Sequence, residues 1–131
     1  MKSSVAVASL LLLASCATTA DKPLYLVGTW GGPHAGIAFH VIADVQFDCA
    51  SGSIDVPIYP AADGSFLVKG TYREGSPGPV RVGQIFHSQE ATYSGNVTEQ
   101  AMILKIELED GSLLGPFSLT QGAPSQITRC L

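Results

Sequence analysis

The side chains best suited to bind a metal are His34, His40, Asp48 and Asp55, which fall close together in the first half of the sequence. Imidazole and carboxylate groups together are the ligands of a catalytic zinc that keeps one coordination position open. Their spacing gives this site little support, because His34 lies in a Gly-Pro-rich turn and His40 lies on the solvent-facing side of a predicted strand. We expect turn or surface roles for both histidines, with no metal and no cofactor.

Acid-base and nucleophilic chemistry have even weaker candidates. Glu107, Glu109 and Asp110 form a carboxylate cluster, but alternate charges along a strand usually serve only to solvate its outer face. The serines fall mainly in turns and lack the strand-turn-helix context of an activated nucleophile. We therefore expect a protein that is not an enzyme. A metal-dependent hydrolase that uses His34 and nearby acids is the enzymatic alternative.

Cys16 follows an N-terminal export signal. The apolar run over 5–14 stands behind Lys2 and is too short to cross a membrane as a helix, so it predicts a signal peptide. Leu-Ala-Ser-Cys at 13–16 resembles the bacterial lipobox, a signal whose cysteine is acylated after cleavage just before it. Cleavage by an ordinary signal peptidase among the small residues over 15–20 is the alternative.

The expected organisation has three parts. Residues 1–15 form the lipoprotein signal peptide, 16–23 carry the lipidated cysteine and a short polar tether, and 24–131 form the folded domain. The expected location is the bacterial cell envelope, with a lipid anchor in the outer membrane facing the periplasm, because Ala17 replaces the aspartate associated with inner-membrane retention.

Two of the three cysteines remain once Cys16 is assigned to lipid attachment. In an oxidising compartment Cys49 and Cys130 can then pair, and the disulfide would stabilise the fold by roughly 3 to 5 kcal/mol in the chain-entropy description. Two separate buried thiols are the alternative. A metal site is less favoured, because neither cysteine has a second ligand beside it.

The charge pattern excludes two classes of partner. The formal net charge is −4 at pH 7, and the chain has no run of Lys or Arg. Neither nucleic acid nor an anionic lipid surface is an expected electrostatic partner. We expect membrane contact to come through the lipid anchor, and a further partner to be an envelope protein.

Alternation of apolar and polar residues with period two predicts an all-β domain. The expected strands cover 25–30, 39–49, 54–59, 66–73, 80–84, 91–97, 102–108, 113–121 and 126–131. Turn residues stand between several of them, as Ala-Ser-Gly at 50–52 and Asp-Gly at 63–64 and 110–111. The expected fold is a single small antiparallel β-barrel of about eight strands, which leaves no exposed sheet edge. A β-sandwich is the alternative.

Gly28-Thr29-Trp30 resembles the Gly-x-Trp opening of lipocalins and other calycin-like barrels. The resemblance implies that Trp30 plugs one end of a barrel and that an arginine near the chain end, Arg129 here, packs over it. The resemblance implies no particular ligand.

The order GTWGGPH, VQFDCASGSID, GSFLVKGTY, GPVRVG, ATYSGNV, LGPFSLTQG and RCL is similar to that of a family of uncharacterised secreted bacterial proteins. This resemblance covers nearly the whole mature chain. It implies a fold and a pairing of Cys49 with Cys130, but no activity.

Two loops are candidate binding surfaces. The first, around Trp30, Gly31, Gly32 and His34, can expose backbone groups to a protein or glycan, or can serve as a tight turn that lets Trp30 enter the core. The second is the Pro-Gly-rich connection flanked by Arg73 and Arg81, which can dock a partner or be a rigid hairpin tip. These features suggest a lipid-anchored module that binds an envelope protein, for instance as an enzyme inhibitor, or a small apolar ligand. A purely structural envelope component is a further alternative.

Overall fold

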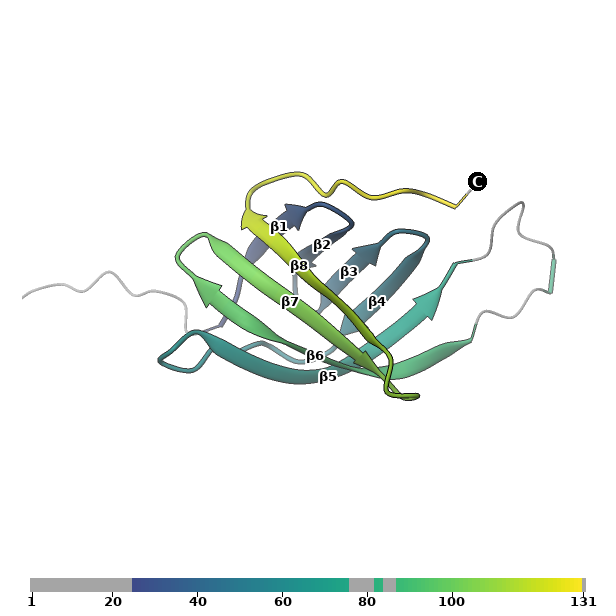
Figure 1. Cartoon of the computed structure of the whole chain (residues 1–131), viewed down its shortest axis with the longest axis horizontal. Helices are drawn as coiled ribbons and strands as arrows, with labels where there is room; N and C mark the ends of the chain where they lie inside the picture. Colours follow the sequence, from purple (N-terminus) through teal and green to yellow (C-terminus); the bar gives the residue numbers. More distant parts are fainter. Residues whose placement is uncertain (1–24, 76–81, 84–86, 131) are drawn as a thin grey trace, which may run out of the picture.

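The structure, a computed structural model, describes residues 25–75, 82–83 and 87–130. Eight antiparallel strands close into one barrel, in which each strand pairs with its neighbours in sequence and the first pairs with the last (Figure 1). The strands are β1 (Gly28–Gly32), β2 (Ala35–Phe39), β3 (Ala43–Phe47), β4 (Ala50–Ile54), β5 (Ser65–Glu74), β6 (Ser88–Thr98), β7 (Ala101–Leu108) and β8 (Leu113–Gln121). The all-β barrel predicted from the sequence is confirmed, and the chain does not form the alternative sandwich.

Some of the expected features fall beyond this description. Cys16, Arg81, the signal peptide over 1–15 and the tether over 16–23 lie outside the described residues. In the part of the chain that is described, a helix with the length and apolar character needed to span a membrane is not found.

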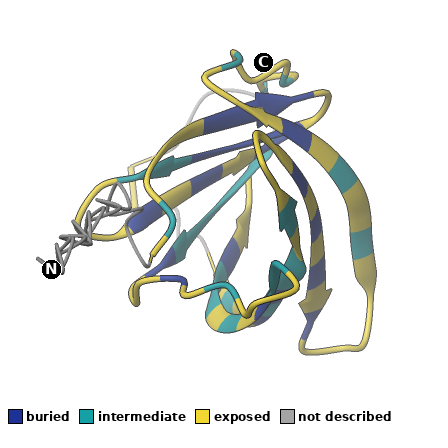
Figure 2. Ribbon diagram, turned by 90° about the vertical axis from the view of Figure 1, so that its left-hand side faces the viewer, coloured by how far each residue is buried: buried dark blue, intermediate teal, exposed yellow. Residues whose placement is uncertain are grey.

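The barrel encloses a single apolar core. Along β7, buried and exposed residues alternate without interruption (Figure 2). The buried residues are Met102, Leu104, Ile106 and Leu108, which belong to the core. This pattern follows from the two-residue repeat of a strand, which sends successive side chains to opposite faces of the sheet. The prediction made for this strand from its sequence is confirmed.

Tyr93 on β6 is buried in the core against β4 and β5. Its ring is fully buried, and its hydroxyl donates to the main-chain oxygen of Thr71 at 2.6 Å. A Cβ atom at Gly52 or Gly70 would overlap the Tyr93 side chain, so both glycines make room for it. Burial raises the pKa of the Tyr93 phenol and keeps it protonated as a donor. The interior around Tyr93 is therefore packed with protein side chains.

The run over 39–49 forms two strands, and the prediction of a single strand was wrong. β2 ends at Phe39 and β3 begins at Ala43, with an exposed turn between them that contains His40 and Val41. The expected turn at 50–52 belongs instead to β4. The actual turn lies just before it, where Cys49 adopts a positive φ of 50°.

Two expected strands are irregular segments. After Ile54 the chain leaves the sheet, and Pro57 and Pro60 have no N–H group to donate to a neighbouring strand. Ile58 in this connection is fully buried and packs against the core. The segment over 126–130 makes only an isolated parallel bridge, between Gln126 and Pro33. Of the strand expected over 80–84, only Val82 and Gly83 are described, and they lie in a turn.

Antiparallel order gives the barrel two different ends. One end holds the turns after β1, β3 and β7, and we call it the strap end because residues 122–130, the C-terminal strap, finish there. The other end holds Tyr25, the turn after β2 and the connection after β4. We call it the apolar end, because several exposed apolar side chains gather there.

Candidate functional site

The C-terminal strap runs from β8 across the outside of β1 and β2 toward the strap end (Figure 1). The Gly122 N–H donates to the oxygen of Thr29 at 2.7 Å, and Gln126 exchanges main-chain hydrogen bonds with Gly32 and His34 at 3.0 and 2.8 Å. Because these bonds use main-chain groups, they fix the path of the strap whatever its side chains are.

Two glycines on the outer face of the β1–β2 pair explain how the strap lies so close to the sheet. Gly31 and Gly36 face each other across the two strands. A Cβ at Gly31 would overlap the carbonyl oxygen of Ala123, and a Cβ at Gly36 would overlap the Ser125 side chain. Gly31 and Gly36 therefore form the surface on which the strap lies, whereas Gly32 lies against the main-chain oxygen of Ser118 on β8.

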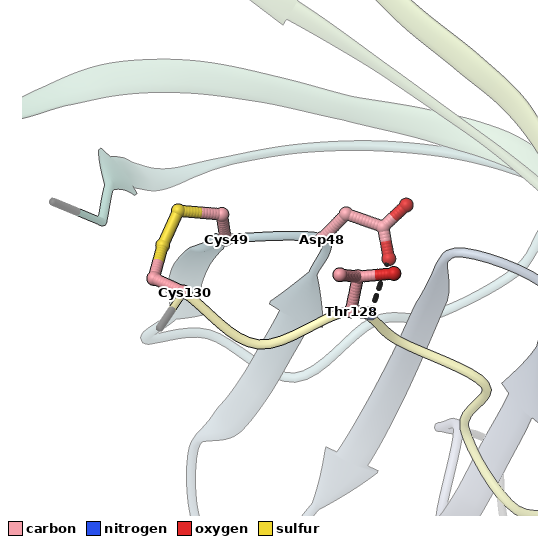
Figure 3. The surroundings of a disulfide bond; sticks show 4 residues. All are labelled: Asp48, Cys49, Thr128 and Cys130. Atoms are coloured by element: carbon pink, nitrogen blue, oxygen red, sulfur yellow. Dashed lines mark hydrogen bonds between the residues drawn. A yellow bond between two sulfur atoms is a disulfide. The ribbon is translucent and has the colours of Figure 1, made fainter. Parts of the chain in front are cut away.

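The strap ends at a disulfide with the β3–β4 turn. Cys49 and Cys130, the cysteines expected to pair, lie at disulfide distance with Cα atoms 4.8 Å apart (Figure 3). Just before the bond, the Cys49 N–H donates to the Thr128 oxygen at 2.9 Å, and the Gly75 N–H donates to the Cys49 oxygen at 2.7 Å. The strap, the β3–β4 turn and the end of β5 are therefore held together.

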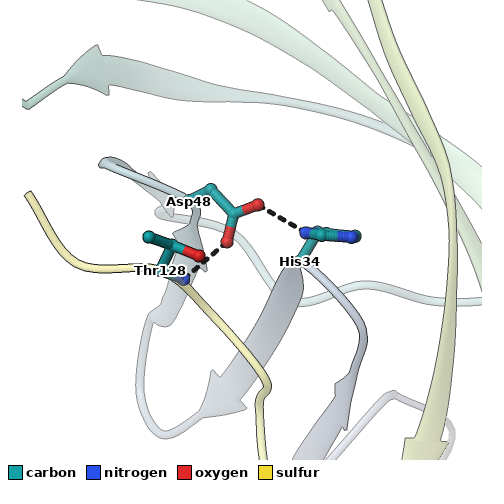
Figure 4. Close-up of polar contacts among 3 residues, drawn as sticks. All are labelled: His34, Asp48 and Thr128. Atoms are coloured by element: carbon teal, nitrogen blue, oxygen red, sulfur yellow. Dashed lines mark hydrogen bonds and ion pairs between the residues drawn. The ribbon is translucent and has the colours of Figure 1, made fainter.

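Asp48 connects the strap to the β1–β2 turn (Figure 4). Its Oδ1 accepts from the Thr128 N–H at 2.6 Å, and its Oδ2 accepts from His34 Nδ1 at 2.5 Å. These bonds favour the charged carboxylate, so the Thr128 amide first and the His34 imidazole second lower the pKa of Asp48. The ionised carboxylate can only accept, which places the proton on His34 Nδ1.

The expected metal ligands are divided between the two ends of the barrel. His34 and Asp48 meet at the strap end, whereas His40 and Asp55 follow β2 and β4 at the apolar end. No cluster of three or more metal-ligating side chains occurs among the described residues. The contact between His34 and Asp48 joins the β1–β2 turn to the β3–β4 turn, where Asp48 also accepts from Thr128 of the strap.

A depression of about 300 Å³ opens on the barrel surface beside the strap. Arg73 on β5 and Arg129 on the strap line it together with Ser51, the disulfide and Thr128. A second depression of about 260 Å³ shares Ser51 and Arg73 and adds hydroxyl groups of β4, β5 and β6. We call this surface the arginine–hydroxyl face, and it consists of Ser51, Ser53, Thr71, Arg73, Ser88 and Arg129.

The arginine–hydroxyl face carries two guanidinium groups and four hydroxyl groups. Ser53 Oγ and Thr71 Oγ1 lie 2.8 Å apart and share a hydrogen bond across β4 and β5. Arginine guanidinium groups donate in a fixed planar geometry that suits carboxylate and carbonyl oxygens. The chemistry of this face suits recognition of an acceptor-rich group.

Of the residues that the sequence suggests for a binding surface, the structure buries some and exposes others. Trp30 is only 3% exposed, Gly31 and Gly32 are buried beneath neighbouring chain, and these three cannot be part of an exposed surface. His34 and Arg73 are exposed. The buried Trp30 agrees with the alternative in which this loop lets the ring enter the core, where its Nε1 donates to the Val27 oxygen at 3.1 Å.

Arg129 and Trp30 line different depressions. Arg129 stands beside the disulfide, whereas Trp30 contributes to a hollow bordered by Gly36, Asp44 and the beginning of the strap. Sequence reasoning missed Ser51, Ser53 and Thr128 as site residues. The serines were assigned to a turn or left without a role, and the Thr128 main-chain amide has no signal in the sequence.

The fold and site define a small closed barrel with an external, disulfide-linked strap. Comparison of the chain with protein-family models, with curated proteins and with solved structures finds no match.

Proposed function

We propose that this chain is a lipid-anchored module of the bacterial envelope, and that its barrel binds another envelope protein through the arginine–hydroxyl face. One observation carries the proposal: the strap forms a fixed wall of a surface depression that contains two arginines. Preorganised groups bind with a smaller loss of conformational entropy than mobile ones. The packed interior beside Tyr93 favours a partner on the outside over a small ligand in the barrel.

The anchor follows from the lipobox-like sequence at 13–16, and it has its own test. Mass spectrometry of the mature protein should find an acylated Cys16 at the amino terminus. An unmodified chain that begins at Thr18 or Asp21 would contradict the anchor.

The binding surface is tested by photo-crosslinking of the full chain in its own envelope. A photoreactive residue in place of Ser51 lies in the depression, and the same residue in place of Lys105 lies on the exposed outer face of β7. We expect one discrete crosslinked protein from position 51 and none from position 105. The same products from both positions, or none from position 51, would contradict the proposed surface.

Charge reversal distinguishes binding from mere proximity. Arg129→Glu should lower the yield of the position-51 product, because the depression loses a cationic donor, whereas Lys105→Glu should leave the yield unchanged. If the captured protein is a single enzyme, its inhibition by the purified chain would support an inhibitor role. A spread of envelope assembly components would favour a structural role.

A further inference from the structure

The apolar end of the barrel has an exposed surface that partner binding at the strap end does not explain. Five side chains form it, and we call them the apolar collar: Tyr25, Val41, Ile42, Val56 and Tyr59. Val41 is 93% exposed at the tip of the β2–β3 turn, and Tyr59 is 60% exposed. Contiguous exposed apolar groups of this kind mark sites that contact a protein or a membrane.

The collar is one continuous surface. Tyr25, Val41, Ile42 and Val56 all line a depression of about 290 Å³ at this end. Tyr59 joins them through an edge-on contact with Tyr25, whose ring centroid lies 6.1 Å away. A main-chain bond of 2.9 Å from Leu26 to Ile58 holds the two segments that carry these tyrosines together.

The chemistry of the collar fits the surface of a lipid bilayer. None of its five residues is charged, and two are tyrosines, whose rings combine an apolar body with a polar hydroxyl. Tyrosine is enriched at the level of the lipid headgroups for this reason. Val41 and Ile42 at the turn tip have no polar group and suit the boundary between headgroups and acyl chains.

The position of the anchor selects the bilayer over other occupants. Tyr25 belongs to the collar, and Cys16 stands nine positions before it. Even a fully extended chain spans at most about 3.5 Å per residue, so this connection reaches no further than roughly 30 Å. An acylated Cys16 would therefore hold the collar close to the membrane.

We infer that the apolar collar docks on the bilayer surface. The inference rests on the proposed lipid anchor. Docking turns the opposite end of the barrel outward, so that the strap and the arginine–hydroxyl face point away from the membrane. Lipid attachment and collar contact together give the domain one orientation, which a tether alone would not give.

Tryptophan fluorescence of the full lipidated chain in phosphatidylcholine vesicles tests this orientation. The chain has one tryptophan, Trp30, which is buried and provides a constant background. Val41→Trp places a probe in the collar, and Leu113→Trp is the matched control, because Leu113 is apolar and 75% exposed at the strap end. With brominated acyl chains, we expect a blue shift and loss of emission at position 41 and neither at position 113.

Flotation of the same vesicles separates the inference from the anchor. A chain that floats with the vesicles while position 41 keeps its emission overturns the docking and leaves the anchor in place. A chain that neither floats nor is quenched overturns both. Equal quenching at positions 41 and 113 also overturns the docking. A dimer in detergent solution that is lost in Val41→Asp overturns it as well, since a second copy of the chain would then cover the collar.

Discussion

The two ends of the barrel are built on different physical principles. At the strap end, a disulfide and the hydrogen bond from the Thr128 N–H to Asp48 join segments about 80 positions apart in sequence. At the apolar end, main-chain bonds from Leu26 to Ile58 and from Val97 to Gly64 join segments only about 30 positions apart, and a buried Ile58 lies beneath the exposed collar. The strap end is thus held by a covalent bond and long-range hydrogen bonds, whereas the apolar end combines shorter-range hydrogen bonds with an exposed apolar surface.

This difference suits the two proposed roles. A protein partner is recognised by donors held at defined positions, which requires a rigid support. A bilayer is fluid and has no fixed geometry to match, so apolar area is sufficient for contact. A small domain can therefore place its covalent and long-range bonds where recognition occurs and expose apolar side chains at the other end.

The largest expected effect is the loss of the disulfide. Its cysteines are 81 positions apart, and in the chain-entropy description a closed loop of this size stabilises the folded state by about 4 kcal/mol. The double variant Cys49→Ala/Cys130→Ala should lower the free energy of unfolding in urea by about this amount. A double variant as stable as the parent chain would contradict the pairing.

Amide hydrogen exchange sharpens this prediction. In the double variant, the amides at positions 49 and 128 donate the hydrogen bonds that join the strap to the β3–β4 turn. Their protection against exchange should fall by more than the loss of global stability requires. The Leu26 amide at the apolar end should follow global stability only. Equal additional loss at both ends would show that the two ends are not independent.

The next largest loss of stability is expected for substitution of Gly31 or Gly36, the two glycines beneath the strap. Gly31→Ala places a methyl group against the main chain at Ala123, which cannot rotate away, and should cost roughly 1 to 3 kcal/mol in unfolding free energy. Gly36→Ala meets the Ser125 side chain instead. Addition of Ser125→Gly should therefore restore part of the stability lost in Gly36→Ala and none of that lost in Gly31→Ala.

The outcome of this cycle is measured by urea unfolding of the single and double variants. Equal rescue of both glycine variants by Ser125→Gly would mean that general flexibility of the strap, and not a local steric contact, determines the cost. Ser125→Gly alone provides the matched control, since it changes the strap without placing an atom in the sheet.

The sequence predicts the barrel best where strands follow strict alternation. β7 and β5 were located from their two-residue repeat, because burial of one face imposes that repeat on the sequence. The turn after β2 was missed because Val41 continues the apolar parity of its neighbours while lying outside the barrel. An apolar residue type predicts burial only at positions where an exposed apolar side chain has no role of its own.

The strap could not be predicted for a different reason. It is held by main-chain groups, and the hydrogen bonds of Gln126 and Thr128 leave no trace in the side-chain pattern. The pairing of Cys49 with Cys130 was expected from cysteine counting and is the feature that places the strap. The sequence gives no reason for glycine at 31 and 36, because the segment that lies against them is about 90 positions away.

The smallest expected effect is a change in acid sensitivity at Asp48. The folded-state pKa of Asp48 lies below its ordinary value near 3.8, because the Thr128 amide and His34 stabilise the carboxylate. Its contribution to stability is therefore complete above about pH 4 and is lost as the pH falls through the lowered folded-state pKa. Asp48→Asn should destabilise the chain at neutral pH, and the difference from the parent should shrink in acid.

Asp63→Asn is the matched control for this change. The pKa of Asp63 is also lowered, but its bonds go to Ser65, two positions away in a turn at the apolar end. Both variants should reduce the acid sensitivity of urea unfolding, yet only Asp48→Asn should expose the Thr128 amide to exchange. Loss of Thr128 protection in Asp63→Asn would contradict the separation of the two ends, because a local turn would then control the strap.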